Sequence, residues 1–240
     1  MATNNLTQEL IRLSQKYVRE VLSQKYAAIW DKTCVYLYGS VSYGEADESS
    51  NANLQVISSD EELNRNQPFF VQYEGRQIMV MFGYSWSQAE KYLIGLPVDD
   101  EAGLYGIHQA IVLHDPAGRF KKIQEKVNHY YPDKTWKDKL FKKWLSYFYA
   151  RSGLKNSLIR NESIVVQIYK GKLLQEIMEL TFILNRQYFP FAKWLHRKFL
   201  GLPLLSKEIE PHLHRIVEEN KVDDLLNEID TVRYVFYRLC

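Results

Sequence analysis

The residues most suited to chemistry lie in one short stretch, Tyr36 to Ile57, with the sequence YLYGSVSYGEADESSNANLQVI. An apolar run leads into Gly39 and Ser40, and apolar residues return after Asn53. A strand that ends in Gly-Ser brings backbone N–H groups and a hydroxyl next to phosphate oxygens, because glycine lets the backbone approach closely and serine donates a hydrogen bond. The stretch therefore predicts a phosphate-handling turn between two strands.

Strands are expected on both sides of this turn. Segments rich in β-branched and aromatic residues predict strands at 33–40, 52–59, 67–75, 76–85 and within 107–116. Glu74-Gly75 is the expected turn between the third and fourth strands, and Asp115-Pro116 is a turn signal after the fifth. The first part of the chain therefore has the material for a sheet.

Helices are expected around these strands. Apolar residues recur at near-helical spacing from Leu6 to about Trp30, with Thr7 as a plausible N-cap. Ser85 is expected to cap a helix over 86–96, and residues 117–131 return to the helical period. Alternation of helices and strands predicts an α/β arrangement for this part of the chain.

The pattern changes after Pro132. All further periodic segments predict helices, at 136–158, 164–185, 191–200, 206–219 and 223–239. The sequence therefore predicts two domains, an α/β domain over 1–132 and a helical C-terminal domain over 133–240.

The run GSVSYGEADESSNANLQVI resembles the signature of the nucleotidyltransferase superfamily, the fold shared by polymerase-beta-like enzymes and by aminoglycoside and lincosamide nucleotidyltransferases. The family pattern is Gly-Ser, a glycine a few residues on, and Ser-Asp-x-Asp-Leu at the start of the next strand. The matching residues keep this spacing without a gap: Gly39, Ser40, Gly44, Glu45, Ala46, Asp47, Ser50, Leu54, Val56 and Ile57. The resemblance is strongest over 33–83 and extends to an Asp-Pro-x-Gly element at Asp115, as in the antibiotic-modifying branch.

This resemblance implies an α+β fold, in which a mixed β-sheet with helices is followed by an all-helical C-terminal domain. It implies ATP or another NTP as a ligand, Mg²⁺ as the metal, and transfer of a nucleotide monophosphate to a hydroxyl of a small molecule such as an antibiotic. The nucleotide-binding residues that it implies are Gly39, Ser40, Tyr43, Ser50, Lys170 and Lys172. Tyr43 stands where active members often have a basic residue.

The carboxylates of the family are missing where the pattern expects them. In the family, an Asp-x-Asp pair binds divalent metal, and a third carboxylate on a neighbouring strand orients or activates the acceptor hydroxyl. Here the pair is Asn51 and Asn53, and the third position falls on Met79 or Met81. Glu74 precedes that strand and does not replace the third acid. Mg²⁺ is held mainly by charged oxygens, so the change predicts severe loss of metal binding.

Two functions remain open for such a chain. The first is a catalytically degenerate protein that keeps a cleft for a nucleotide or small molecule and acts by binding, as a regulator or as a subunit of a complex. The alternative is an active metal-dependent nucleotidyltransferase in which Asn51 and Asn53, or Glu45 and Asp47, position the metal together with the substrate phosphates. Asparagines introduced to trap a substrate would account for the Asn pair but not for the apolar residues on the third strand.

Composition limits the partners. A hydrophobic fraction of 46% with 25% charged residues is typical of globular proteins, and a net charge of +2 does not favour nucleic acid as a partner. Basic residues gather over 119–160, so a nucleic-acid-binding module that uses this segment is a third hypothesis. Cys34 and Cys240 form no disulfide framework, and no apolar run is long enough for a bilayer or an export signal. A cytoplasmic protein without membrane contact is expected.

Other polar and aromatic residues are expected to be structural. His212 and His214 form a His-x-His pair whose rings point to different sides of a helix, with no carboxylate or cysteine to complete a ligand set. Aromatic residues of the C-terminal part, such as Trp136, Trp144 and Tyr147, are expected in a core rather than in a stacking platform for bases.

Overall fold

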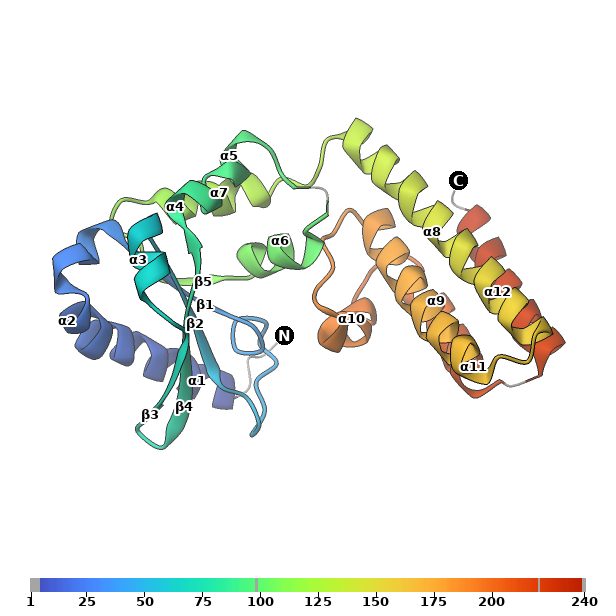
Figure 1. Ribbon diagram of the computed structural model, residues 1–240, viewed down its shortest axis with the longest axis horizontal. Coiled ribbons are helices and arrows are strands. Elements are labelled where there is room, and N and C mark those ends of the chain that lie inside the picture. The colour runs from blue at the N-terminus through green and yellow to red at the C-terminus, as the bar shows by residue number, and fades with distance from the viewer. Residues whose placement is uncertain (1–4, 98, 220, 239–240) are drawn as a thin grey trace. The chain divides into compact units, whose positions relative to one another are not determined.

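The computed structural model describes residues 5–97, 99–219 and 221–238. The chain divides into two compact units, Met1–His129 and Tyr130–Cys240. The first contains a mixed five-stranded sheet with helices, and the described elements of the second are all helices (Figure 1). The predicted α+β fold class is therefore confirmed. No helix among the described residues combines the length and the apolar character needed to cross a bilayer.

The sheet of the first unit has a central parallel pair of strands. Its five strands are β1 (Cys34–Tyr38), β2 (Ala52–Ser58), β3 (Phe69–Tyr73), β4 (Arg76–Ser85) and β5 (Ile111–His114). Their order across the sheet is β3-β4-β2-β1-β5. β2 and β4 run parallel, and the other neighbouring pairs are antiparallel. The strand that follows the Gly39-Ser40 turn therefore lies in the middle of the sheet.

Strand alternation separates an apolar face of the sheet from a more polar one. The apolar face packs on helix α1 (Asn5–Tyr17), and the buried residues of this contact include Leu10, Leu13, Val35, Leu37, Leu54, Val56, Ile78 and Val80. On the other face, Tyr36 stacks on Phe120 of helix α7 (Arg119–Val127), with ring centroids 4.3 Å apart. Helices thus cover both faces.

Two local predictions are confirmed at the ends of β4. Glu74 and Gly75 have φ values of 48° and 79°, which fits the two-residue hairpin turn between β3 and β4. Ser85 forms a capping box at helix α4 (Trp86–Ala89): its hydroxyl accepts from the backbone N–H of Gln88, and the Gln88 side chain accepts from the backbone N–H of Ser85.

The N-terminal helix differs from its prediction. Three short segments follow α1: a π-helical turn (Val18–Leu22), α2 (Ser23–Lys25) and a 3-10 turn (Ala27–Lys32). Thr7 is not an N-cap, because the chain is already helical at Asn5. Its buried hydroxyl instead accepts a hydrogen bond of 3.3 Å from the backbone N–H of Ala46. Helix α1 therefore supports the turn that follows β1.

Two helices of the first unit are not predicted by the sequence, α3 (Asp60–Arg65) and α6 (Glu101–His108). α3 has no buried residue, and α6 contains Gly103 and Gly106, so neither shows a clear apolar period. The helix predicted over 86–96 is divided into α4 and α5 (Lys91–Ile94).

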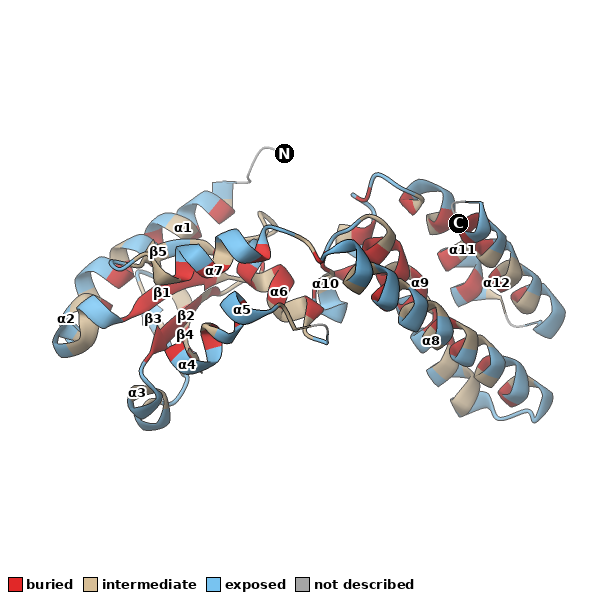
Figure 2. Cartoon of the chain, turned by 90° about the horizontal axis from the view of Figure 1, so that it is seen from above, coloured by how far each residue is buried: buried red, intermediate tan, exposed pale blue. Residues whose placement is uncertain are grey.

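The second unit consists of α8 (Asp133–Ile159), α9 (Ser163–Leu184), α10 (Ala192–Phe199), α11 (Ser206–Glu218) and α12 (Val222–Tyr237). Its buried residues lie mainly on the helix faces that meet one another (Figure 2). Tyr147 is fully buried, and its hydroxyl donates to the carbonyl of Ile229 at 3.0 Å. This hydrogen bond ties α8 to α12.

Candidate functional site

The turn between β1 and β2 is built on two glycines with left-handed backbones. Gly39 has a φ of 80° and Gly44 a φ of 75°. The backbone N–H of Tyr43 donates to the carbonyl of Gly39 at 3.0 Å, which closes the turn. A Cβ on Gly39 would lie 3.1 Å from Nδ2 of Asn53. Glycine at position 39 is therefore required both for the backbone conformation and for the approach of Asn53.

Strand register places Asn53 on the polar face, near the start of β2. It lies opposite Tyr38 of β1 and opposite Met79 of β4. Asn51 directly precedes β2, which begins at Ala52. The structure thus brings Asn53 close to Gly39 and opposite Met79, the third position of the family pattern.

Three polar side chains at the turn have no internal partner. Ser40 is buried, and Asn51 and Asn53 are half-buried. None of the three side chains makes a hydrogen bond with another described residue. Polar groups removed from water cost free energy unless something bonds to them, so the hydroxyl and both amides are available to a ligand or to solvent.

The acidic part of the loop is bonded within itself. Oδ1 of Asp47 accepts from the backbone N–H and the hydroxyl of Ser49, at 3.1 and 2.7 Å, and from the hydroxyl of Ser50 at 3.0 Å. The backbone N–H of Asp47 in turn donates to the Ser50 hydroxyl at 3.0 Å. Ser50, a predicted nucleotide-binding residue, thus stabilises the conformation of the loop.

Tyr43 is a neutral group in this site. Its ring meets that of Tyr105 of α6 edge to face, with centroids 5.1 Å apart. Burial, with a smaller effect of Tyr38, raises the pKa of Tyr43 to about 12. Tyr43 therefore brings no charge toward a phosphate, unlike the basic residue that the resemblance implies at this position.

The third family position has no acid nearby on β4. Met79 and Met81 are half-buried, and the hydroxyl of Tyr38 donates to Sδ of Met81 at 2.8 Å. Burial, followed by the effect of Tyr84, raises the pKa of Tyr38 to about 12, so this hydroxyl stays protonated. Glu74 forms an ion pair with Lys16 of α1, the helix that covers the opposite face. The expectation that Glu74 does not replace the third acid agrees with this geometry.

These side chains do not fit the Mg²⁺ ion that the resemblance implies. Mg²⁺ takes charged oxygens and substrate phosphates in an octahedral arrangement, whereas the two positions of the family pair offer neutral amides and the neighbouring strand offers thioethers. Among the acids of the loop, Oδ1 of Asp47 already accepts hydrogen bonds from Ser49 and Ser50. Among the described residues, the group of three His, Cys, Asp or Glu side chains that lie close enough to hold a metal is in the second unit.

A cavity of about 370 Å³ lies in the first unit and was not predicted from the sequence. It is lined by Gly83, Tyr84, Gln88, Lys91, Tyr92, Gly95, Pro97 and Asp100. A Cβ on Gly83 would lie 2.6 Å from Nε2 of Gln55, which is two residues after Asn53 on β2. The cavity therefore belongs to the same face of the sheet as the turn. Its residues come from one strand end and several short segments, so no sequence spacing marks it.

The two predicted lysines belong to the second unit. Lys170 is buried, and its Nζ donates to the carbonyls of Val217 and Glu219 at 3.1 and 2.7 Å. Burial lowers the pKa of Lys170. These contacts give Lys170 a structural task at the end of α11, which argues against a nucleotide-binding role. Lys172 is exposed, and its predicted role stays a prediction.

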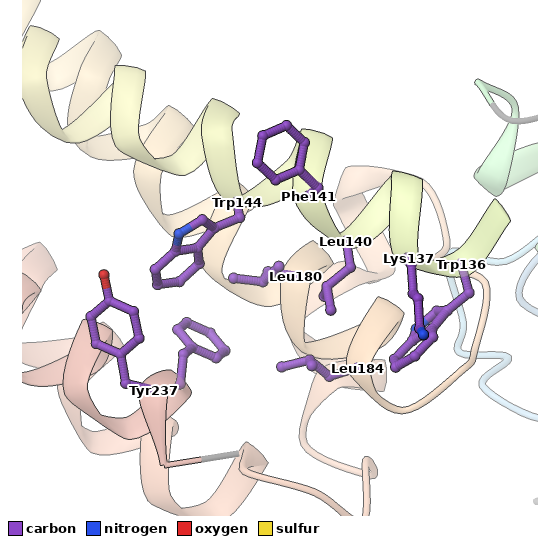
Figure 3. A pocket seen from close by; sticks show the side chains of 9 residues that line it. Trp136, Lys137, Leu140, Phe141, Trp144, Leu180, Leu184 and Tyr237 are labelled. Carbon is purple, nitrogen blue, oxygen red and sulfur yellow. The ribbon is translucent and has the colours of Figure 1, made fainter. Parts of the chain in front are cut away.

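An apolar groove of about 430 Å³ lies between α8, α9 and α12 (Figure 3). It is lined by Trp136, Lys137, Leu140, Phe141, Trp144, Leu180, Leu184, Phe236 and Tyr237. The two tryptophans are packed into the helical unit: Trp144 stacks on Tyr147 with centroids 5.4 Å apart, and the indole N–H of Trp136 donates to the carbonyl of Ile183 at 2.7 Å. Tyr147 is buried in the core and Trp144 packs against it, as the sequence predicts, whereas Trp136 is half-buried outside that cluster.

Comparison with known proteins supports the fold but assigns no reaction or ligand to the chain. A family model described as a domain of unknown function (DUF4037) matches residues 99–195. No curated protein matches the chain. A crystal structure of a nucleotidyltransferase-like protein from Exiguobacterium sibiricum 255-15 is similar, with a TM-score of 0.56 over 94% of this chain and 75% of that one, at 8% identity. The chain therefore has a nucleotidyltransferase-like fold.

Proposed function

We propose that this chain is a nucleotidyltransferase-like protein that binds a nucleotide or a related phosphate-bearing small molecule and does not catalyse metal-assisted transfer. The observation that carries the proposal is the set of unpartnered polar side chains at the turn, Ser40, Asn51 and Asn53, beside a strand that presents Met79 instead of an acid. The biological role is then binding or regulation, alone or with a protein partner.

The Asn pair favours phosphate without metal. An aspartate beside a phosphate repels it unless a cation lies between them, whereas the amide of Asn51 or Asn53 donates a hydrogen bond to a phosphate oxygen. The hydroxyl of Ser40 and the backbone N–H groups of the turn add donors of the same kind. Exchange of two carboxylates for two amides thus changes the preferred ligand from a metal–phosphate complex to a bare phosphate.

Loss of the acids also explains why transfer is not expected. A bound metal ion supplies several kcal/mol of transition-state stabilisation in such reactions, and each 1.36 kcal/mol is about tenfold in rate. Without ligands for the metal, the reaction would slow by orders of magnitude. ATP or another NTP remains the expected ligand class.

The cavity beyond Gln55 supports a ligand with a part other than phosphate. About 370 Å³ lies in the usual range for small-molecule pockets, and Tyr84, Tyr92 and Asp100 supply aromatic surface and polar atoms. The hydroxyl of Tyr92 donates to Oδ2 of Asp100 at 2.9 Å, which fixes both groups. We assign this cavity to the organic part of the ligand.

The experiment is thermal unfolding with ATP, GTP, CTP and UTP, each with Mg²⁺, with Mn²⁺ and with a chelator. A ligand at about 100 times its dissociation constant stabilises the folded state by roughly 2.7 kcal/mol, which for a chain of this size raises the midpoint by roughly 5–10 °C. The expected result is a rise with at least one nucleotide that persists in the chelator and falls to about half or less in Ser40→Ala. No rise with any nucleotide would contradict the proposal.

The alternative of an active enzyme has its own outcome in the same experiment. It requires a rise that depends on metal, together with transfer of labelled nucleotide that Ser40→Ala abolishes. The triple change Asn51→Asp, Asn53→Asp and Met79→Asp separates the two functions further. Under the proposal it weakens nucleotide binding in chelator and makes binding dependent on Mg²⁺, whereas an enzyme that already uses the amides would show no new dependence on metal.

A further inference from the structure

We propose a transition-metal site in the second unit, formed by His196 of α10 with Glu210 and His214 of α11. The ligand atoms of these three side chains all lie within 4.8 Å of one another. Nε2 of His214 is 3.1 Å from Oε1 of Glu210, and the rings of His196 and His214 have centroids 6.0 Å apart. The sequence did not indicate this group, because its members come from two helices.

Helix spacing explains two of the three ligands. Glu210 and His214 are four residues apart in α11, so their side chains lie on one face, one above the other. Buried Ile209 and Leu213 occupy the adjoining face and hold that side of the helix against the core. Glu210 and His214 are thereby directed away from the core in a fixed relation.

The third ligand is positioned by the connection between α10 and α11. Leu195 and Phe199 anchor α10 in the core on either side of His196. Asn185 makes two hydrogen bonds to Leu204 in the connecting loop. Its Oδ1 accepts from the backbone N–H of Leu204 at 2.9 Å, and its Nδ2 donates to the carbonyl of Leu204 at 3.1 Å. The two helices are therefore held by the fold itself, before any metal binds.

The ligand set selects the kind of metal. Two imidazoles and one carboxylate are a frequent zinc set and also suit Co²⁺ and Ni²⁺, whereas Mg²⁺ requires oxygen ligands. Bonds of about 2.0–2.2 Å in a tetrahedral site place ligand atoms roughly 3.4 Å apart. Glu210 and His214 already meet this spacing, and His196 needs only a small rotation of an exposed side chain.

The observed contacts leave the site open to an ion. The imidazole nitrogens of His196 make no hydrogen bond with another described residue. The Glu210–His214 contact is a surface pair, which contributes little by itself, so a metal would displace little. Three protein ligands leave a fourth position for water or for a donor from another molecule. The ion would fasten α10 to α11.

His212, on the same helix, provides a matched control. Its Nδ1 contacts Glu228 of α12 and an Nη2 of Arg215, so its ring faces away from the proposed site. The variant His212→Gln therefore removes one histidine of α11 without touching the ligand set. His196→Gln, Glu210→Gln and His214→Gln each remove one ligand and keep the approximate shape of the side chain.

The test is titration of the chelator-treated full chain with Co²⁺, followed by visible absorption, and with Zn²⁺, followed by calorimetry. We expect one equivalent to bind, with affinity at least about tenfold lower in each of the three ligand variants and unchanged in His212→Gln. Zn²⁺ should raise the melting midpoint of the native chain and of His212→Gln more than that of the three variants. The melting midpoint without metal verifies that each variant folds.

Several results would overturn the proposal: no saturable binding, equal affinity in all variants, or a loss in His212→Gln as large as in His214→Gln. Ser40→Ala should leave Zn²⁺ binding unchanged, because Ser40 belongs to the other unit. Failure of nucleotide binding and failure of metal binding are therefore distinguished by separate variants and separate probes.

Discussion

Lys143 of α8 is largely buried between carboxylates of α9, including that of Glu176, with Nζ and Oε2 3.0 Å apart. At the turn of the first unit, by contrast, Ser40, Asn51 and Asn53 have polar side chains with no partner among the described residues. Burial of a polar group is costly in either place, so the difference lies in what compensates it. For Lys143 the compensation is internal, whereas at the turn it is left to solvent or a ligand. Internal pairing is expected of a polar group that stabilises the fold, and unpaired polar groups are expected of a binding site.

The largest expected effect comes from breaking the internal compensation. Lys143→Met leaves Glu176 and Glu179 with an uncompensated charge, because their side chains are only 9% and 7% exposed. Removal of one partner of a buried ion pair costs about 3 kcal/mol or more, and the melting midpoint should fall by roughly 6 °C or more. Thermal unfolding measures this directly. Lys142→Met, at an exposed neighbour, should change stability by less than about 0.5 kcal/mol, and an equal loss in both variants would contradict the internal pairing.

A smaller effect, with a defined pH dependence, is expected at Glu228. Burial alone would raise the pKa of Glu228, but hydrogen bonds from Arg215 and His212 lower it overall below its ordinary value of 4.5. A lowered folded-state pKa stabilises the protein above pH 4.5, and this stability is lost as pH falls through the folded-state value. Glu228→Gln should therefore cost about 1.5 kcal/mol at pH 7 and progressively less below pH 4.5.

Urea unfolding of native chain and Glu228→Gln at pH 7 and at pH 3.5 measures this difference. Glu61→Gln is the control, because Glu61 forms an exposed i,i+4 pair with Arg65 that contributes little. A cost for Glu228→Gln that does not depend on pH would show that the carboxylate charge is not what stabilises the contact.

At Gly39, stability and binding should change together. Gly39→Ala places a side chain at a φ of 80° and 3.1 Å from Nδ2 of Asn53, which should cost about 1–2 kcal/mol and displace the Asn53 amide. Gly118→Ala has a similar backbone penalty, with a φ of 63°, but a Cβ there meets nothing within 4 Å. Calorimetric titration with nucleotide should show weaker binding for Gly39→Ala alone. Equal loss in both variants would remove the turn from the binding site.

The smallest stability effect is expected at Ser40. Its hydroxyl has no partner among the described residues, so Ser40→Ala should change unfolding free energy by less than about 0.5 kcal/mol. A hydrogen bond to a charged phosphate contributes about 1.5–3 kcal/mol, so nucleotide affinity should fall by roughly tenfold or more. If Ser40→Ala lowered the unfolding free energy and left nucleotide affinity unchanged, Ser40 would be a structural residue and not a binding residue.

Local signals in the sequence predicted much of the sheet. Glu74-Gly75 was predicted to join two strands and Ser85 to cap a helix, and both features are present in the structure. The family pattern placed Gly39 and Asn53 in the same segment, and the structure brings the two residues close together. The family resemblance added the order of elements, and the fold comparison agrees with it.

Features that depend on tertiary contacts could not be predicted from the sequence. The hydroxyl of Thr7 was interpreted as a cap, whereas it bonds a loop 39 residues later. His214 was compared with its near neighbour His212, although its partners in space are Glu210 and His196. A sequence motif identifies residues that lie close together along one helix or strand. The Thr7 contact and the His196–Glu210–His214 group instead join residues of different elements, and their positions depend on how the chain folds between those elements.

The hydrogen bond from Ala46 to Thr7 has an evolutionary consequence. It ties the first helix to the loop between β1 and β2, although the two are encoded far apart. Selection on the turn should therefore extend to position 7, and relatives without a hydroxyl there should have a loop of different length between positions 39 and 53. Thr7 and the loop would then be inherited as one unit.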